Sequence, residues 1–157
     1  MTATLTKNYR AAADKLDVAA LYVGQTLMGI PIDQVEEINH QLDLTPVPQT
    51  PPQVRGVVNL RGEVVTVIDL RVVLGLEPTV LAKQTCNVLV RSQGEQVGLL
   101  ADRVADVIRT RRSDIERPPA NVGGTSGRFF QGVCKLKEGL LVILDVEEVL
   151  AIPPPAR

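Results

Sequence analysis

The sequence predicts an all-β protein made of two small, related barrels, and three observations lead to this fold class. Short apolar stretches rich in Val, Ile and Leu recur about ten times along the chain and are typical of strands. Gly and Pro separate these stretches at short intervals, and no long helical pattern follows residue 18. The third observation is an internal repeat. Short, regularly spaced strands favour a barrel or a sandwich, and two copies of a five-stranded unit would give two barrels side by side.

The repeat is clearest between residues 56–74 and 132–150, which align without a gap. The identical pairs are Gly56/Gly132, Val57/Val133, Leu60/Leu136, Asp69/Asp145, Val73/Val149 and Leu74/Leu150. A shorter repeat relates residues 29–38 to residues 98–107, with Gly, Asp and Val at equal positions. Chance similarity between two generic hairpins is the alternative, and the common order of both repeats disfavours it. We therefore expect a pseudo-symmetric protein of two related modules.

In the first half, residues 1–18 are expected to form a flexible or short helical leader. Residues 20–23 and 26–32 predict a hairpin around a Gly-Gln turn, and Asp33 is expected to cap one helical turn over residues 34–38. Four prolines between residues 45 and 52 predict an extended, irregular connection. A second hairpin joins residues 57–60 to residues 64–70 through Arg61 and Gly62, and Asp69 is expected to cap a short helix over residues 70–74.

The second half repeats this order of elements. Residues 85–92 and 96–100 predict a hairpin, and Asp102 is expected to open a short turn over residues 103–105. A polar loop over residues 111–127 precedes the last hairpin, for which Gly139 indicates a three-residue loop. Asp145 is expected to cap a helix over residues 146–150. Residues 19–152 are thus expected to form a single domain of two barrels, and residues 153–157 a tail.

Composition and charge exclude several classes of function. Seventeen basic and eighteen acidic residues leave a net charge of −1, so nothing draws the chain to nucleic acid or anionic lipid. No apolar run approaches the roughly 20 residues that a membrane helix needs, which predicts a cytoplasmic protein without membrane insertion. Cys86 and Cys134 lie in strand-like segments and are expected to be buried thiols; a disulfide between them has no support in the sequence.

No set of residues indicates catalysis. His40 is the single histidine and has neither a nucleophile nor a metal ligand at useful spacing. The acid pairs 36–37 and 147–148 are interpreted as solvated residues, and the glycines of segment 123–127 lack the lysine of a phosphate loop. The sequence therefore predicts no enzyme, no cofactor and no metal. A small β enzyme is the competing class.

The segment Gly56-Val57-Val58-Asn59-Leu60-Arg61-Gly62, followed by Val67-Ile68-Asp69-Leu70-Arg71, resembles the signature of the CheW-like chemotaxis coupling family. The resemblance extends over residues 29–38, 44–48, 98–107 and 132–150, and so covers nearly the whole chain after residue 19. It implies two intertwined, five-stranded SH3-like barrels with an apolar groove between them. It also implies a non-enzymatic adaptor that joins the regulatory domain of a CheA-type histidine kinase to the cytoplasmic tips of chemoreceptors.

By the same resemblance, the receptor-binding residues are expected to be Arg61, Gly56, Asn59, Gly62 and Val35. Glu37 is the expected kinase-binding residue. An apolar groove suits one face of a receptor helix, and Arg61 on a rigid turn can make charge-assisted hydrogen bonds to a partner. A solvated turn residue is the alternative for Arg61. Adaptors of related chemosensory pathways that control type IV pili, gliding or another output share the motif, and form the alternative function.

Overall fold

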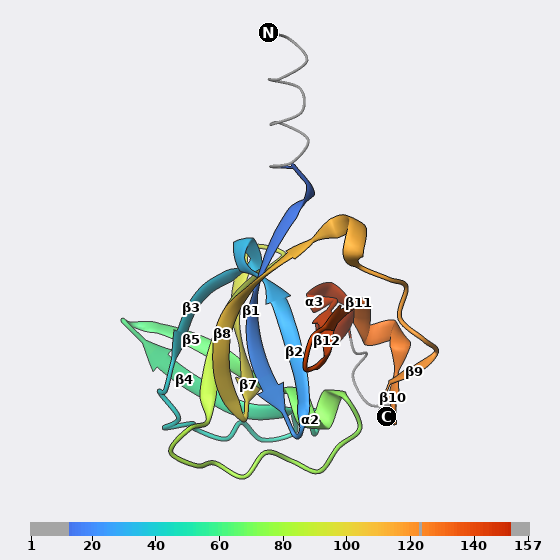
Figure 1. Cartoon of the computed structure of the whole chain (residues 1–157). Coiled ribbons are helices and arrows are strands. Elements are labelled where there is room, and N and C mark those ends of the chain that lie inside the picture. Colours follow the sequence, from blue (N-terminus) through green and yellow to red (C-terminus); the bar gives the residue numbers. More distant parts are fainter. Residues whose placement is uncertain (1–12, 123, 152–157) are drawn as a thin grey trace, which may run out of the picture.

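The computed structural model describes residues 13–122 and 124–151, which form two five-stranded sheets, one two-stranded ribbon and a few short helices (Figure 1). The predicted all-β class is therefore confirmed. Each five-stranded sheet curls into a barrel, and we call the two barrel A and barrel B.

Barrel A has the strand order β11-β12-β2-β1-β8. Its strands are β1 (Lys15–Val23), β2 (Thr26–Pro31), β8 (Arg103–Arg111), β11 (Phe130–Leu136) and β12 (Gly139–Leu144). Barrel B has the order β3-β6-β7-β5-β4. Its strands are β3 (Val35–Asn39), β4 (Val54–Leu60), β5 (Glu63–Asp69), β6 (Cys86–Ser92) and β7 (Glu95–Ala101). The remaining elements are the ribbon of β9 (Asn121–Val122) and β10 (Thr125–Ser126), the helices α2 (Leu70–Val73) and α3 (Val146–Leu150), and the 3-10 turns η1 (Ile32–Gln34), η2 (Arg112–Asp114) and η3 (Gly127–Phe129).

The two halves of the chain exchange a hairpin. Strands β1 and β2 belong to the first half, but they pair in barrel A with β8 and β12 of the second half. Strands β6 and β7 belong to the second half, but they pair in barrel B with β3 and β5 of the first. Both exchanges use the same geometry, since β2 runs parallel to β12 and β7 runs parallel to β5. This is the intertwined, pseudo-symmetric arrangement that the sequence led us to expect.

A short backbone bridge brings the two edges of each sheet towards each other. In barrel B, Thr45 exchanges two hydrogen bonds with Val57, with N–O distances of 2.8 and 2.9 Å. In barrel A, Glu116 exchanges the same pair of bonds with Val133. The repeat aligns Val57 with Val133, so both barrels close at the same position. Closure protects edge strands that would otherwise pair with other chains.

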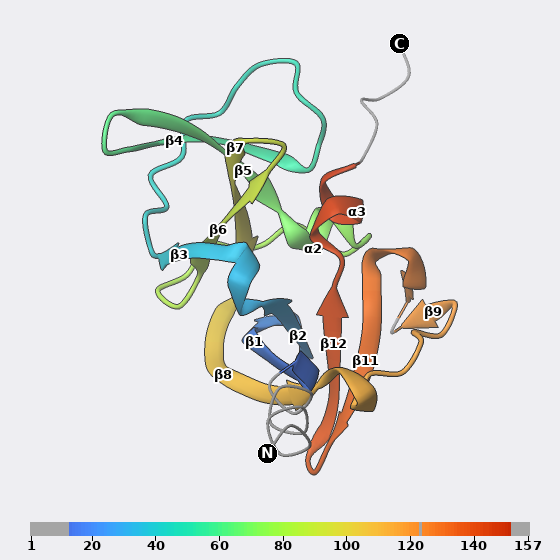
Figure 2. The same ribbon diagram turned by 90° about the horizontal axis from the view of Figure 1, so that it is seen from above.

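The largest apolar cluster lies between the barrels and draws on both. Leu21 of β1, Val88 of β6 and Leu144 of β12 are fully buried in it, together with residues of α2 and α3. Figure 2 shows the two short helices lodged between the barrels. Smaller clusters fill the individual barrels. Because the largest cluster is shared, each barrel depends on the other for most of its buried apolar contacts. Cys86 lies in the shared core and Cys134 in barrel A, and both are free thiols.

Several local predictions are confirmed. Turns of two residues join β1 to β2 and β4 to β5. The Asp69 carboxylate accepts a hydrogen bond from the backbone of Arg71 and caps α2, and Asp145 caps α3 in the same way. Asp69 has a second role that the sequence did not indicate: it is fully buried and forms an ion pair with Arg55 at 2.7 Å.

Other predictions were wrong, because long-range strand pairing overrides local signals. Residues 35–39 form strand β3 instead of a helical turn, since they pair with β6, and Asp33 caps nothing. Residues 103–111 form one long strand paired with β1, where a short turn was expected. The last hairpin closes through two residues, 137 and 138, instead of three. Strand β1 begins at Lys15 rather than after the expected leader boundary at residue 18, because Leu16 and Val18 pack in barrel A. Residues 1–12 and 153–157, the rest of the expected leader and the tail, lie outside the described residues.

Candidate functional site

The turn between β4 and β5 presents Arg61 at the tip of barrel B. Arg61 and Gly62 have φ angles of 51° and 86°, as in the two-residue turns whose twist matches that of the strands. The Asn59 side chain accepts a hydrogen bond from the backbone of Gly62 at 3.0 Å and holds the turn. The Arg61 side chain is 72% exposed. The turn thus holds the backbone in place and leaves most of the guanidinium free for contacts.

One contact of Arg61 joins opposite edges of barrel B. Its Nη2 lies 2.8 Å from Oε1 of Glu37 on β3, although β3 and β4 are the outer strands of the sheet. Glu37 also accepts a hydrogen bond of 2.8 Å from Asn39. The hydrogen bond from Asn39, and then the one from Arg61, lower the pKa of Glu37 below its ordinary value. Arg61 and Glu37 therefore form a charged pair across the seam of the barrel.

This pair changes how the expected site residues are divided. The resemblance assigned Arg61 to the receptor and Glu37 to the kinase, but a direct contact places them on one continuous surface. Val64, which stands opposite Asn59 on β5, belongs to the same tip and is 70% exposed. The sequence analysis missed Val64. The available signal was an apolar residue at the second position after the turn, whose partner across the hairpin, Asn59, is polar.

Gly56 and Val35 lie at different places in barrel B. Gly56 is buried five residues from Arg61 along the strand, or roughly 16 Å. A side chain there would collide with the backbone of Thr45, and its φ of 147° also disfavours any other residue. Gly56 therefore serves barrel closure. Val35 is half-buried on β3 and packs against the shared core.

A second surface includes β3 of barrel B and β8 of barrel A. The repeat aligns these two strands with each other. The exposed apolar side chains of these two segments are Ile32, which precedes β3, and Val104 and Val107 on β8, and of these three Val104 lines the cavity between the segments. A cavity of about 480 Å³ joins the end of β3 to the start of β8, and His40 and Val104 both line it. His40 Nδ1 lies 2.9 Å from the carbonyl oxygen of Thr85. We call this surface the β3–β8 groove; both ribbon views place β3 and β8 on the same side of the molecule (Figures 1 and 2).

A polar network ties the barrels together at another junction. Asp102, between β7 and β8, accepts a hydrogen bond from the backbone of Gly24 and pairs with Arg71 of α2 at 2.9 Å. The backbone of the β1–β2 turn and the Arg71 side chain of α2 are thereby both held by one carboxylate. The sequence analysis did not foresee this network, because its members are far apart along the chain.

Glu36 and the two thiols serve structure. Glu36 forms an ion pair with Arg91 and accepts a hydrogen bond from Gln96, and the bond from Arg91 is the main reason that the pKa of Glu36 is lowered. Burial raises the pKa of Cys86 to about 11 and also raises that of Cys134, so both are protonated at neutral pH and are poor nucleophiles.

Within the described residues, no group of three or more His, Cys, Asp or Glu side chains is arranged to hold a metal ion. In the same part of the chain, no helix is long and apolar enough to cross a membrane.

Comparisons with known proteins agree with this architecture. The model of the CheW-like domain family matches residues 17–153. The chemotaxis protein CheW of Helicobacter pylori is 34% identical over 135 residues, which cover 86% of this chain and 81% of that protein. CheW of Bacillus subtilis is 34% identical over 121 residues, covering 77% and 78%. The crystal structure of the scaffolding protein TtCheW from Thermoanaerobacter tengcongensis superposes with a TM-score of 0.80 at 27% identity, covering 87% of this chain and 88% of that one. The chain belongs to the CheW-like domain family.

Proposed function

We propose that this protein is a non-enzymatic chemotaxis scaffold that couples chemoreceptor tips to the regulatory domain of a CheA-type kinase. Family membership and the similarity to a scaffolding protein support this function. The observation that carries it is the presence of two separate surfaces with exposed apolar side chains, one at the tip of barrel B and one in the β3–β8 groove. A coupling protein needs two such surfaces, because both partners must bind at once.

The receptor tip, a helical hairpin, is assigned to the β3–β8 groove and to the neighbouring end of β3. Helices bind in grooves through apolar residues on one face, and Ile32, Val104 and Val107 offer matching contacts. Val35 supports the groove from the core side. Arg61 reaches β3 through Glu37, so its remaining hydrogen-bond donors extend the receptor surface.

The kinase domain is assigned to the part of the tip of barrel B around Val64 on β5, and the Arg61–Glu37 pair marks its border with the receptor surface. Val64 gives an apolar contact there, and Glu37 lies at its border. The kinase's own CheW-like domain would pack against this tip barrel to barrel. Gly56, Asn59 and Gly62 take part indirectly, because they fix the backbone on which both partners depend. The protein would act in the cytoplasm, at the membrane-associated receptor array, through its partners alone and without a cofactor.

The test measures the affinity of single variants for a receptor cytoplasmic fragment and for the kinase regulatory domain. Val107→Asp should weaken receptor binding, and Val64→Asp should weaken kinase binding, each with little effect on the other partner. Val80→Asp is the matched control, because Val80 is 84% exposed and does not line the cavity of the β3–β8 groove. If both variants weakened the same partner only, or if the two partners competed, the two-surface scaffold would be excluded.

A further inference from the structure

The two barrels differ in charge at one point of their corresponding turns, where Glu138 of barrel A stands in the place of Gly62 of barrel B. In barrel B, Arg61 of the β4–β5 turn pairs with Glu37 of β3. The repeat aligns Arg61 with Lys137 and Gly62 with Glu138, both in the β11–β12 turn, and it aligns Glu37 with Asp106 of β8. Barrel A thus has an acidic residue both on the turn and on the facing strand. The ion pair that spans the seam of barrel B has no counterpart among the described ion pairs of barrel A.

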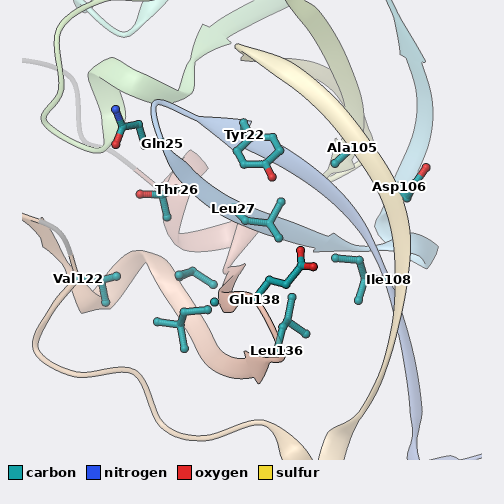
Figure 3. Close-up of a pocket in the computed structure, with 13 residues that line it drawn as sticks. Tyr22, Gln25, Thr26, Leu27, Ala105, Asp106, Ile108, Val122, Leu136 and Glu138 are labelled. Atoms are coloured by element: carbon teal, nitrogen blue, oxygen red, sulfur yellow. The ribbon is translucent and has the colours of Figure 1, made fainter.

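A cavity of about 680 Å³ opens at this place in barrel A. Figure 3 shows the Glu138 carboxylate pointing into the cavity, between Leu27, Ile108 and Leu136. The Tyr22 hydroxyl also faces it, whereas Asp106 stands on the rim with its carboxylate turned away. Leu140 and Val142 complete the apolar wall, and none of the described residues that line the cavity is Lys, Arg or His.

Glu138 is exposed at the turn, and within the described residues its carboxylate forms no ion pair. Among the hydrogen bonds and ion pairs of residues 13–122 and 124–151, none involves its side chain. A carboxylate beside apolar walls binds a cation more favourably when the cation also carries an apolar part that contacts those walls. Binding then forms a charge-assisted pair and removes water from the apolar surface. The volume lies in the range of small-molecule sites, and mouths of β-barrels are a common place for them.

We propose that the mouth of barrel A is a binding site for a small amphipathic organic cation, an ammonium or guanidinium group carried on an aliphatic body. The cationic group pairs with the Glu138 carboxylate and donates a hydrogen bond to the Tyr22 hydroxyl oxygen. The aliphatic body lies against Leu27, Ile108 and Leu140. The site is independent of the scaffold function: Val104 lines the cavity of the β3–β8 groove, while Ala105, Asp106 and Ile108 of the same strand line the cavity of barrel A.

The experiment titrates the full-length protein with n-hexylguanidinium and follows backbone amide signals by NMR. Saturable shifts should cluster at residues 22–27, 105–108 and 136–142. Hexanoate has a similar aliphatic body with the opposite charge and should not bind. Guanidinium alone lacks the apolar body and should bind much more weakly.

Two variants and one control make the test specific. Glu138→Gln keeps the shape of the side chain and should weaken n-hexylguanidinium roughly tenfold or more, the effect of losing a charge-assisted contact. Leu140→Ala should also weaken the binding of n-hexylguanidinium, because it removes part of the apolar wall. Glu77→Gln, which neutralises an exposed carboxylate outside the cavity, should leave the affinity unchanged. The site is refuted if hexanoate binds equally well, if Glu138→Gln binds as wild type, or if the shifts lie elsewhere.

Discussion

Arg61 and Glu37 form an ion pair with an N–O distance of 2.8 Å that links the two outermost strands of barrel B. Arg61 belongs to the β4–β5 turn, which the sequence predicts. Glu37 belongs to β3, which the local sequence did not predict as a strand. The contact gives Arg61 two potential roles, since it holds β3 beside the turn and it offers free donors to a partner. These roles can be separated experimentally.

Arg61→Ala should weaken receptor binding by about 1.5–3 kcal/mol, because a charge-assisted contact at the interface is lost. The melting temperature should hardly change, since exposed ion pairs contribute little to stability. Receptor titration and thermal melting check both expectations. Kinase affinity should change much less.

The charge swap Arg61→Glu with Glu37→Arg is the control for this prediction. It preserves an ion pair across the seam but moves the guanidinium to β3. Receptor binding should stay weak if Arg61 contacts the receptor directly. Full recovery of binding in the double variant would mean that the pair only positions β3.

Gly56→Ala should destabilise the protein by about 2 kcal/mol or more, because its new Cβ would collide with the carbonyl oxygen of Thr45. Gly132→Ala should behave alike, since a Cβ there would lie 2.8 Å from the carbonyl oxygen of Glu116. Gly75→Ala is the control: its φ is also positive but its surroundings are open, so the cost should be about 1 kcal/mol. Denaturant unfolding measures all three. Equal losses would show that steric closure of the barrels is unimportant.

Asn87→Val should stabilise the protein by about 1–2 kcal/mol. Asn87 is fully buried, and both polar atoms of its side chain lack a hydrogen-bond partner within the described structure. It packs over Gly98, and at the corresponding positions of the other barrel Val18 packs over Gly29. A valine should therefore fit. The reverse change, Val18→Asn, should cost about 2 kcal/mol or more. If Asn87→Val lowered the free energy of unfolding in denaturant, the Asn87 amide would have a hydrogen-bond partner in the folded protein, and the prediction would be wrong.

A fragment of residues 1–80 should not fold alone. It contains β1 and β2 without their neighbours β8 and β12, and β3 and β5 without β6 and β7. Too little apolar surface would be buried to offset the chain entropy. Mixing this fragment with residues 81–157 should restore dispersed amide signals. Cooperative melting of the isolated fragment would contradict the shared core.

Acid should weaken barrel B through Glu36 and Glu37. Both have a folded-state pKa below the ordinary value of 4.5, mainly through hydrogen bonds from Arg91 and Asn39 respectively. A lowered folded pKa means that the stabilisation is fully present above the unfolded value and is lost as the pH falls through the folded one. Unfolding midpoints followed from neutral pH to below pH 4.5 should therefore drop less steeply in the Glu36→Gln, Glu37→Gln double variant than in wild type. Parallel curves would mean that other carboxylates cause the acid sensitivity.

The sequence by itself determined the elements whose chemistry is local. Gly62 and the residues around it predicted the hairpin turn, Asp69 and Asp145 predicted the helix caps, and the two repeats predicted paired barrels. The turn and the caps depend on residues a few positions apart, and the repeats are visible by aligning the chain with itself, so the pattern of residue types is enough to recognise them. The family resemblance rests on the same stretches.

Tertiary structure alone decided the features that depend on distant partners. Strand β3 formed where a helical turn was expected, because β6 lies beside it and supplies its hydrogen bonds. The contact of Arg61 with Glu37, the unpaired amide of Asn87 and the acidic mouth around Glu138 arise only when the hairpins exchange between barrels. Strand pairing satisfies backbone groups across the whole chain, so it outweighs the weak preference of a single turn.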